Sequence, residues 1–152
     1  MMLQVVPTHW YSWDVRITDE SRPVADIATS WWREKGRLTI DGVTYRVSRE
    51  GPMSGAFVLE HAGDVLARAE KPSVFRREFV IRHADREYTL RPTSIFRRAF
   101  VLLEGSREVG SITPQNAFTR KAAADLPNDL PLPVRVFIVW LIVISWRRAQ
   151  DA

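Results

Sequence analysis

The 152-residue sequence contains no cysteine. Disulfide bonds, thiolate zinc sites and a cysteine nucleophile are therefore excluded, and the composition suits a reducing compartment. Residues 1–13 also lack the basic segment, the apolar stretch and the small-residue cleavage site of a secretory signal peptide. We therefore expect a cytoplasmic protein that is not exported.

Sequence motifs of catalysis are missing as well. The chain has no glycine-rich phosphate loop, no nucleophile elbow and no pair of carboxylates on one helix. Of its three histidines, His61 and His83 occupy equivalent positions of a repeat and have no acidic or histidine partner at ligand spacing. The sequence therefore predicts no catalytic residue, no metal site and no cofactor. An enzyme with a site on outer loops is an alternative for which no residue can be named.

The sequence does contain a repeat, whose copies begin at Phe57, Phe79 and Phe100. Each copy starts Phe-Val-aliphatic, passes through small or polar residues (AGD, ADRE, GSRE), resumes alternating apolar residues and reaches a proline. Phe, Val and Ile suit a pleated, half-buried surface, whereas Gly, Asp and Ser favour turns. Each copy is therefore predicted to be a β-hairpin.

Two further hairpins are predicted upstream of the repeat. Asp41-Gly42, a pair that favours the type I′ turn, lies between residues 38–40 and 43–45, and residues 14–18 and 24–28 alternate around DESRP. The count of strands approaches a dozen, and such a meander hides its edges as a sandwich or a closed barrel. The length suits one domain, residues 1–152.

The stretch VRVFIVWLIVISWRR at 134–148 follows the breaker-rich DLPNDLPLP. It is long for a strand, so a helix is predicted over about 133–148, with Pro133 in its first turn. Residues 136–146 carry no charge, and a helix that is apolar on every side must be buried. Eleven residues rise only about 16 Å, whereas a bilayer asks for roughly 20 residues.

The repeated hairpins and the buried apolar helix together favour a mainly β fold. We expect a closed antiparallel barrel of about twelve strands, built from the hairpins and enclosing the C-terminal helix. This pattern resembles the tubby C-terminal-like superfamily, which includes LURP-one-related proteins and phospholipid scramblases. The resemblance rests on the Phe-Val hairpins at 57, 79 and 100, on ADLPNDLPLP at 124–133 and on VFIVWLIVISW at 136–146. It covers about Trp13 to Arg148, and it implies a twelve-stranded barrel around a hydrophobic helix.

The resemblance also implies a link to membranes, because tubby binds phosphoinositides and scramblases are tied to membranes. No phosphoinositide-binding motif can be carried over residue by residue. The repeat itself offers candidates, since SVFRREFVI at 73–81 and SIFRRAFVL at 94–102 each hold an Arg-Arg pair. Arg76, Arg77, Arg97 and Arg98 are predicted to form one patch for anionic phospholipid headgroups or phosphate. Solvated arginines that protect strand edges are the alternative.

The aromatic residues near the N-terminus allow two interpretations. Exposed together, Trp10, Tyr11, Trp13, Trp31 and Trp32 would suit base stacking or a membrane interface; buried, they belong to the core. No basic stripe accompanies them, so no nucleic acid is expected.

Taken together, these features favour a non-enzymatic binding or scaffold domain, cytoplasmic or peripheral to the membrane, whose partner is anionic phospholipid or a protein. The alternative is a membrane-attached protein with residues 134–148 as a short C-terminal anchor.

Overall fold

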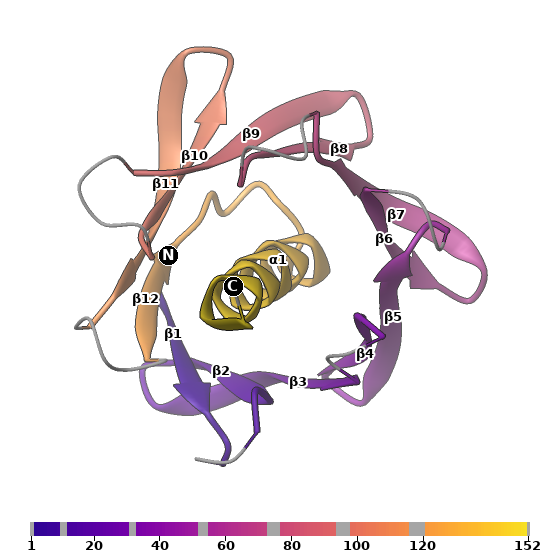
Figure 1. Ribbon diagram of the computed structural model, residues 1–152. Coiled ribbons are helices and arrows are strands. Elements are labelled where there is room, and N and C mark those ends of the chain that lie inside the picture. The colour runs from indigo at the N-terminus through magenta and orange to yellow at the C-terminus, as the bar shows by residue number, and fades with distance from the viewer. Residues whose placement is uncertain are drawn as a thin grey trace.

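The computed structural model describes residues 2–9, 12–30, 33–51, 55–72, 77–93, 98–115 and 121–151, which form twelve β-strands and one α-helix (Figure 1). The first six strands are β1 (Met2–Pro7), β2 (Val15–Asp19), β3 (Arg22–Ser30), β4 (Lys35–Ile40), β5 (Val43–Arg49) and β6 (Ala56–His61). The remaining elements are β7 (Asp64–Glu70), β8 (Phe79–His83), β9 (Arg86–Pro92), β10 (Phe100–Glu104), β11 (Arg107–Pro114), β12 (Ala122–Asp125) and α1 (Leu132–Asp151).

The sheet is a closed antiparallel barrel. Each strand pairs with the next along the chain, and β1 closes the sheet by pairing with β12. The helix α1 lies inside the ring of strands (Figure 1). The predicted fold class is therefore confirmed. Because every strand has two neighbours, the sheet exposes no edge to which another chain could add.

The tight turns of the hairpins lie where their residue types predict them. Asp41 and Gly42 both adopt positive φ angles, 51° and 76°, as the type I′ turn between β4 and β5 requires. Ala62 and Gly63 do the same in the first copy of the repeat, with φ angles of 53° and 89°. Small or short polar side chains suit this region, which explains why the turns repeat in sequence.

The repeated phenylalanines point into the barrel. Phe57, Phe79 and Phe100 begin or nearly begin β6, β8 and β10, and each is at most 1% exposed. The Phe57 ring meets the edge of the Phe79 ring at a centroid distance of 6.0 Å and that of Trp140 on α1 at 5.4 Å. The repeat therefore places three buried aromatic rings in the wall, and one of them, Phe57, packs directly against the helix.

The helix fills the interior of the barrel. Every residue from Val134 to Trp146 is buried, as expected for a helix that is apolar on all sides. Its polar groups have partners: the Trp140 indole N–H donates to Thr29 Oγ1 at 3.1 Å, and the Ser145 hydroxyl donates to the Leu141 carbonyl at 2.9 Å. The helix begins one residue before the predicted Pro133 and extends beyond residue 148.

Candidate functional site

The antiparallel order places the connections between strands alternately at the two ends of the barrel. At one end, the tight-turn end, two-residue turns join the strands at 20–21, 41–42, 62–63, 84–85 and 105–106. At the other end, longer connections span 8–14, 31–34, 50–55, 71–78, 93–99 and 115–121. The helix α1 starts at the tight-turn end and finishes at the end with the longer connections.

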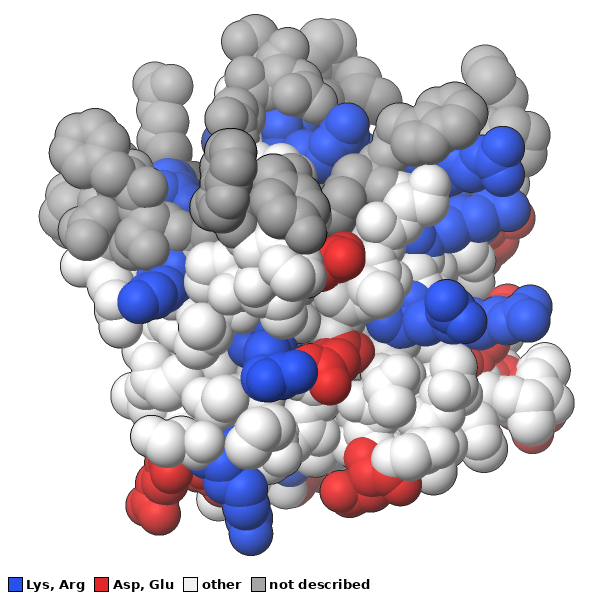
Figure 2. Space-filling view, turned by 90° about the horizontal axis from the view of Figure 1, so that it is seen from below, with Lys and Arg blue, Asp and Glu red and all other residues white. Residues whose placement is uncertain are grey.

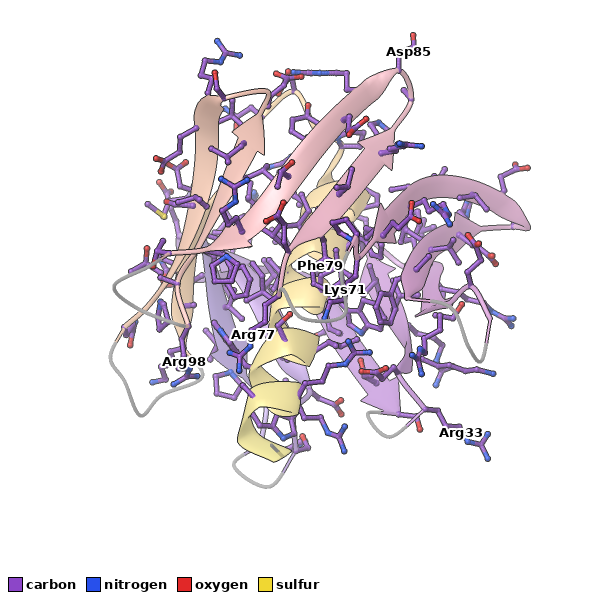
Figure 3. All side chains as sticks on the ribbon, turned by 45° about the horizontal axis from the view of Figure 1, so that its top comes forward. Arg33, Lys71, Arg77, Phe79, Asp85 and Arg98 are labelled. Atoms are coloured by element: carbon purple, nitrogen blue, oxygen red, sulfur yellow. The ribbon has the colours of Figure 1, made fainter. Side chains whose placement is uncertain are left out.

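Charge is distributed unevenly between these ends. The five tight turns contain no Lys or Arg but include Glu20, Asp41 and Asp85. We call the opposite end the cationic end, and its described cations are Arg33, Lys71, Arg77, Arg98, Lys121, Arg147 and Arg148. Figure 3 shows Arg33, Lys71, Arg77 and Arg98 toward the end where α1 finishes, and Asp85 at the other end.

A buried carboxylate lies among these cations. Glu34, in the connection between β3 and β4, is only 8% exposed, and its backbone has a positive φ of 52°. The Arg148 guanidinium donates to both Glu34 oxygens, at 2.6 and 2.7 Å, and the Arg49 Nε lies 3.7 Å from the same carboxylate. This two-pronged geometry ties the last turns of α1 to the wall of the barrel.

Lys71 is a further cation at this end, and it is half-buried. Its Nζ lies 5.9 Å from the centre of the Phe79 ring. Burial lowers the pKa of the Lys71 ammonium, and repulsion from Arg148 and Arg77 lowers it further, with only Glu34 acting in the opposite direction. The positive charges here therefore exceed what Glu34 balances, and a bound anion would be attracted.

Other carboxylates near this end are engaged with different cations. Glu50 is bound by the Arg68 guanidinium through both oxygens, and Glu78 accepts from the Arg91 Nε at 3.3 Å. Hydrogen bonding to Arg68 holds the pKa of the Glu50 carboxyl below its usual value. Glu50 shares the single charge of Arg68 with Glu70, whereas Glu78 is matched by Arg91.

Arg98 is held against the end of the helix. Its guanidinium lies 4.8 Å from the Trp146 ring centre, and its backbone carbonyl accepts a 2.8 Å hydrogen bond from the Trp146 indole N–H. Burial lowers the pKa of Arg98. The arginine therefore covers the last aromatic residue of α1 and places a charge beside the mouth of the barrel.

The predicted arginine patch is described only in half. Arg77 and Arg98 lie at the cationic end, whereas Arg76 and Arg97 fall outside the described residues, so a patch of all four stays a prediction. Sequence reasoning missed Glu34 and Arg148, which meet although they are far apart in the chain. Only the basic residues in four of the six longer connections could have pointed to this end.

The two repeat histidines have local contacts. His83 Nδ1 lies 2.8 Å from the Leu66 carbonyl, and the His61 ring lies 5.0 Å from the Tyr45 ring. Within the described ranges, no group of three or more His, Cys, Asp or Glu side chains is arranged to hold a metal ion.

The aromatic cluster is mostly outside the described residues, which exclude Trp10, Tyr11, Trp31 and Trp32. Trp13 is described, and it is partly buried against the core of the barrel.

Two wider findings concern the whole chain. Among the residues described, no helix combines the length and the apolar character needed to cross a bilayer. No family model, no curated protein and no solved structure matches this chain. The resemblance to tubby-like proteins therefore stays an expectation from sequence pattern.

Proposed function

We propose that this chain is a non-enzymatic binding module whose cationic end contacts anionic phospholipid headgroups. The observation that carries the proposal is the imbalance of charge at this end, where Arg148 and Arg49 share the single carboxylate of Glu34 while Lys71 lies within the repulsion of Arg148 and Arg77. Phosphate oxygens of a headgroup would supply the missing negative charge, and guanidinium groups bind them in pairs.

The shape of the molecule supports a binding role at this end. The helix occupies the barrel interior, where other barrels hold small ligands, so binding has to use the outside or the ends. A cationic end opposite an acidic one would also orient the barrel toward a negatively charged surface. The proposed location is therefore the cytoplasmic face of a membrane, with peripheral attachment.

The alternative, in which the C-terminal helix is a membrane anchor, requires the barrel to lose its central helix. Residues 134–146 would have to leave the barrel to reach lipid, and the wall would then lose the aromatic and aliphatic side chains that fill it. Electrostatic contact through the cationic end leaves the fold unchanged. It predicts attachment that depends on salt, whereas an inserted anchor predicts attachment that does not.

Sedimentation with phospholipid vesicles tests the proposal. We expect the protein to pellet with phosphatidylserine vesicles but not with phosphatidylcholine vesicles at 0.1 M salt, and to be released near 1 M, where the Debye length shrinks to about 3 Å. Arg77→Glu should weaken binding about tenfold or more, because a cation near such a surface is replaced by an anion.

The matched control is Arg22→Glu, which changes net charge equally but lies next to a tight turn at the opposite end. We expect it to bind like the wild type. Equal loss in both variants, or binding to neither kind of vesicle, would contradict the proposal. Binding that resists 1 M salt would favour the anchor instead.

A further inference from the structure

The outer wall of the barrel carries a groove that shares only Arg49 with the residues of the proposed function. It has a volume of about 750 Å³ and lies over β3, β4, β5 and the end of β6. Its lining combines exposed cations, small residues and two carboxylates: Lys35, Arg37, Arg46, Arg49, Ala28, Ser30, Ser48, Asp14 and Glu60 are among them. Such a volume is in the range of small-molecule sites.

Two arginines lie directly opposite each other in this groove. Arg37 on β4 is the register partner of Arg46 on β5, and both are exposed. Like charges at such positions destabilise a sheet, because the Cβ atoms of directly opposed residues are only about 5 Å apart. Within the described part of the chain, neither guanidinium has an ion-pair partner, and Lys35 has none either.

In another cross-strand pair of arginines, nearby carboxylates neutralise both positive charges. Arg68 on β7 is the register partner of Arg82 on β8. Arg68 is bound by Glu50 and Glu70, the latter at 3.0 Å, and Arg82 lies 3.6 Å from Glu87. The sheet therefore neutralises this pair internally. In the Arg37 and Arg46 pair, Glu60 on β6 is the register partner of Arg46, but within the described residues no carboxylate oxygen comes within ion-pair distance of either guanidinium.

The groove lining holds more cations than carboxylates, since Asp14 and Glu60 are its two carboxylates. Figure 2 shows blue side chains gathered toward the upper right of its view, with red ones beside several of them and along the lower margin. Ala28 on β3 lies opposite Arg37, and Ser48 follows Arg46 by two residues on β5, so short side chains leave room beside the two arginines. A small anion in this space lies next to both arginines.

We propose that this groove binds the phosphate group of a small phosphorylated sugar or polyol, held between Arg37 and Arg46. One arginine fork satisfies the two oxygens of a carboxylate, whereas two opposed forks match the three terminal oxygens of a phosphate monoester. The rest of the groove suits hydroxyl groups, because Asp14 and Glu60 offer carboxylate oxygens and Ser30 and Ser48 offer hydroxyls. Asp14 already accepts from the Thr29 backbone N–H at 3.0 Å, which fixes its position.

Titration with glucose 6-phosphate, inorganic phosphate and glucose, followed by amide NMR shifts and calorimetry, tests the proposal. We expect glucose 6-phosphate to bind more tightly than phosphate, and glucose not to bind. The shifts should concentrate at residues 35–37 and 46–48. Arg37→Gln and Arg46→Gln should each weaken binding at least tenfold, the loss expected for a charge-assisted contact.

Two control variants separate this groove from other cations. Arg22→Gln removes the same charge outside the groove, and Arg77→Gln removes one from the cationic end, so both should bind glucose 6-phosphate like the wild type. Binding that is unchanged in Arg37→Gln and Arg46→Gln, or shifts confined to residues around 71 and 77, would overturn the site. Phosphate binding as tight as that of glucose 6-phosphate would overturn the sugar or polyol part.

A stability measurement gives an independent readout of the arginine pair. If the two guanidinium groups are kept for a ligand and not for the fold, Arg37→Gln should unfold at the same or a higher urea concentration than the wild type, because a repulsion is removed. A lower unfolding midpoint in this variant would show that Arg37 stabilises the sheet, and that result would count against the proposal.

Discussion

The two ends of the barrel use the same kind of ion pair with a different balance of charge. At the tight-turn end, Arg86 donates to both oxygens of Glu104 at 2.9 Å and also to Asp129, and Arg107 lies 3.5 Å from Glu104. At the cationic end, one carboxylate, Glu34, contacts both Arg148 and Arg49. The first cluster matches two carboxylates with two cations, whereas the second has more cations than carboxylates.

The pKa shifts of the charged side chains also differ between the two ends. At the tight-turn end the hydrogen bonds to Arg86 hold the pKa values of the Glu104 and Asp129 carboxyls below their usual range, so these charges are stable. At the cationic end, burial and neighbouring arginines lower the pKa of Lys71, so its charge is disfavoured. The cationic end therefore gains from a bound anion, and the tight-turn end does not.

The largest effect is expected from a substitution that weakens the packing of α1, the helix that runs from one end of the barrel to the other. Trp140→Ala should lower the free energy of unfolding by about 3–5 kcal/mol, because it deletes a buried aromatic ring and leaves a cavity between wall and helix. Urea unfolding followed by circular dichroism measures the loss. Val65→Ala, at a residue that is 56% exposed, is the control and should change little. A loss under about 1 kcal/mol for Trp140→Ala would mean that the helix contributes little to the barrel.

A smaller effect comes from the same substitution made at each end. Glu34→Gln should cost about 2 kcal/mol, because it leaves Arg148 without its buried partner; the cost is below that of a fully buried pair, since the Arg148 side chain is 35% exposed. Glu104→Gln should shift the urea midpoint little, because its partner Arg86 is more exposed and keeps Asp129. Equal shifts of the urea midpoint in the two variants would show that the two ion pairs contribute equally to stability, which would contradict this prediction.

The smallest effect is a difference in pH dependence. The pKa of Lys71 is lower in the folded state than in the unfolded state, so as pH rises toward the unfolded value of about 10.4 the unfolded chain binds more protons, and this residue makes stability rise with pH. Tyr88 lies near the start of β9, close to the tight-turn end, and burial raises its pKa. Above about pH 10 the unfolded chain loses the phenol proton that the folded chain keeps, so this residue makes stability fall as pH rises.

Urea unfolding at several alkaline pH values resolves these two contributions. Lys71→Met should flatten the rise, and Tyr88→Phe should remove part of the fall. Tyr88→Phe should also not destabilise the protein at neutral pH, because its buried hydroxyl has no hydrogen-bond partner among the residues that the structure describes. The same pH slope in the wild type and in Lys71→Met would show that Lys71 keeps an ordinary pKa.

Much of the fold could be predicted from the sequence because its signals are local. Turns such as Asp41-Gly42 and the repeated Phe-Val starts place the hairpins directly, and the uncharged run at 136–146 requires a buried helix. The two closing strands had no such signal. β12 is Ala-Ala-Ala-Asp, a composition that does not favour a strand, and it is a strand because β1 and β11 flank it.

The candidate site was less predictable for a similar reason. The doubled arginines stand out because the repeat copies them, but Glu34 and Arg148 meet only when the last helix passes through the whole barrel. The groove on the outer wall depends on the register that places Arg37 opposite Arg46. A hairpin prediction contains this pairing in principle, yet it says nothing of whether a nearby carboxylate neutralises the pair.

The closure of β1 on β12 has a consequence for how the chain folds. The two strands that meet are separated by more than a hundred residues, since Met2 pairs with Asp125. Until they pair, the sheet keeps two open edges beside the apolar helix that belongs inside. Pairings of such long sequence separation slow folding, and open edges on a partly formed sheet invite association. We therefore expect closure of the barrel around its helix to be a late step of folding.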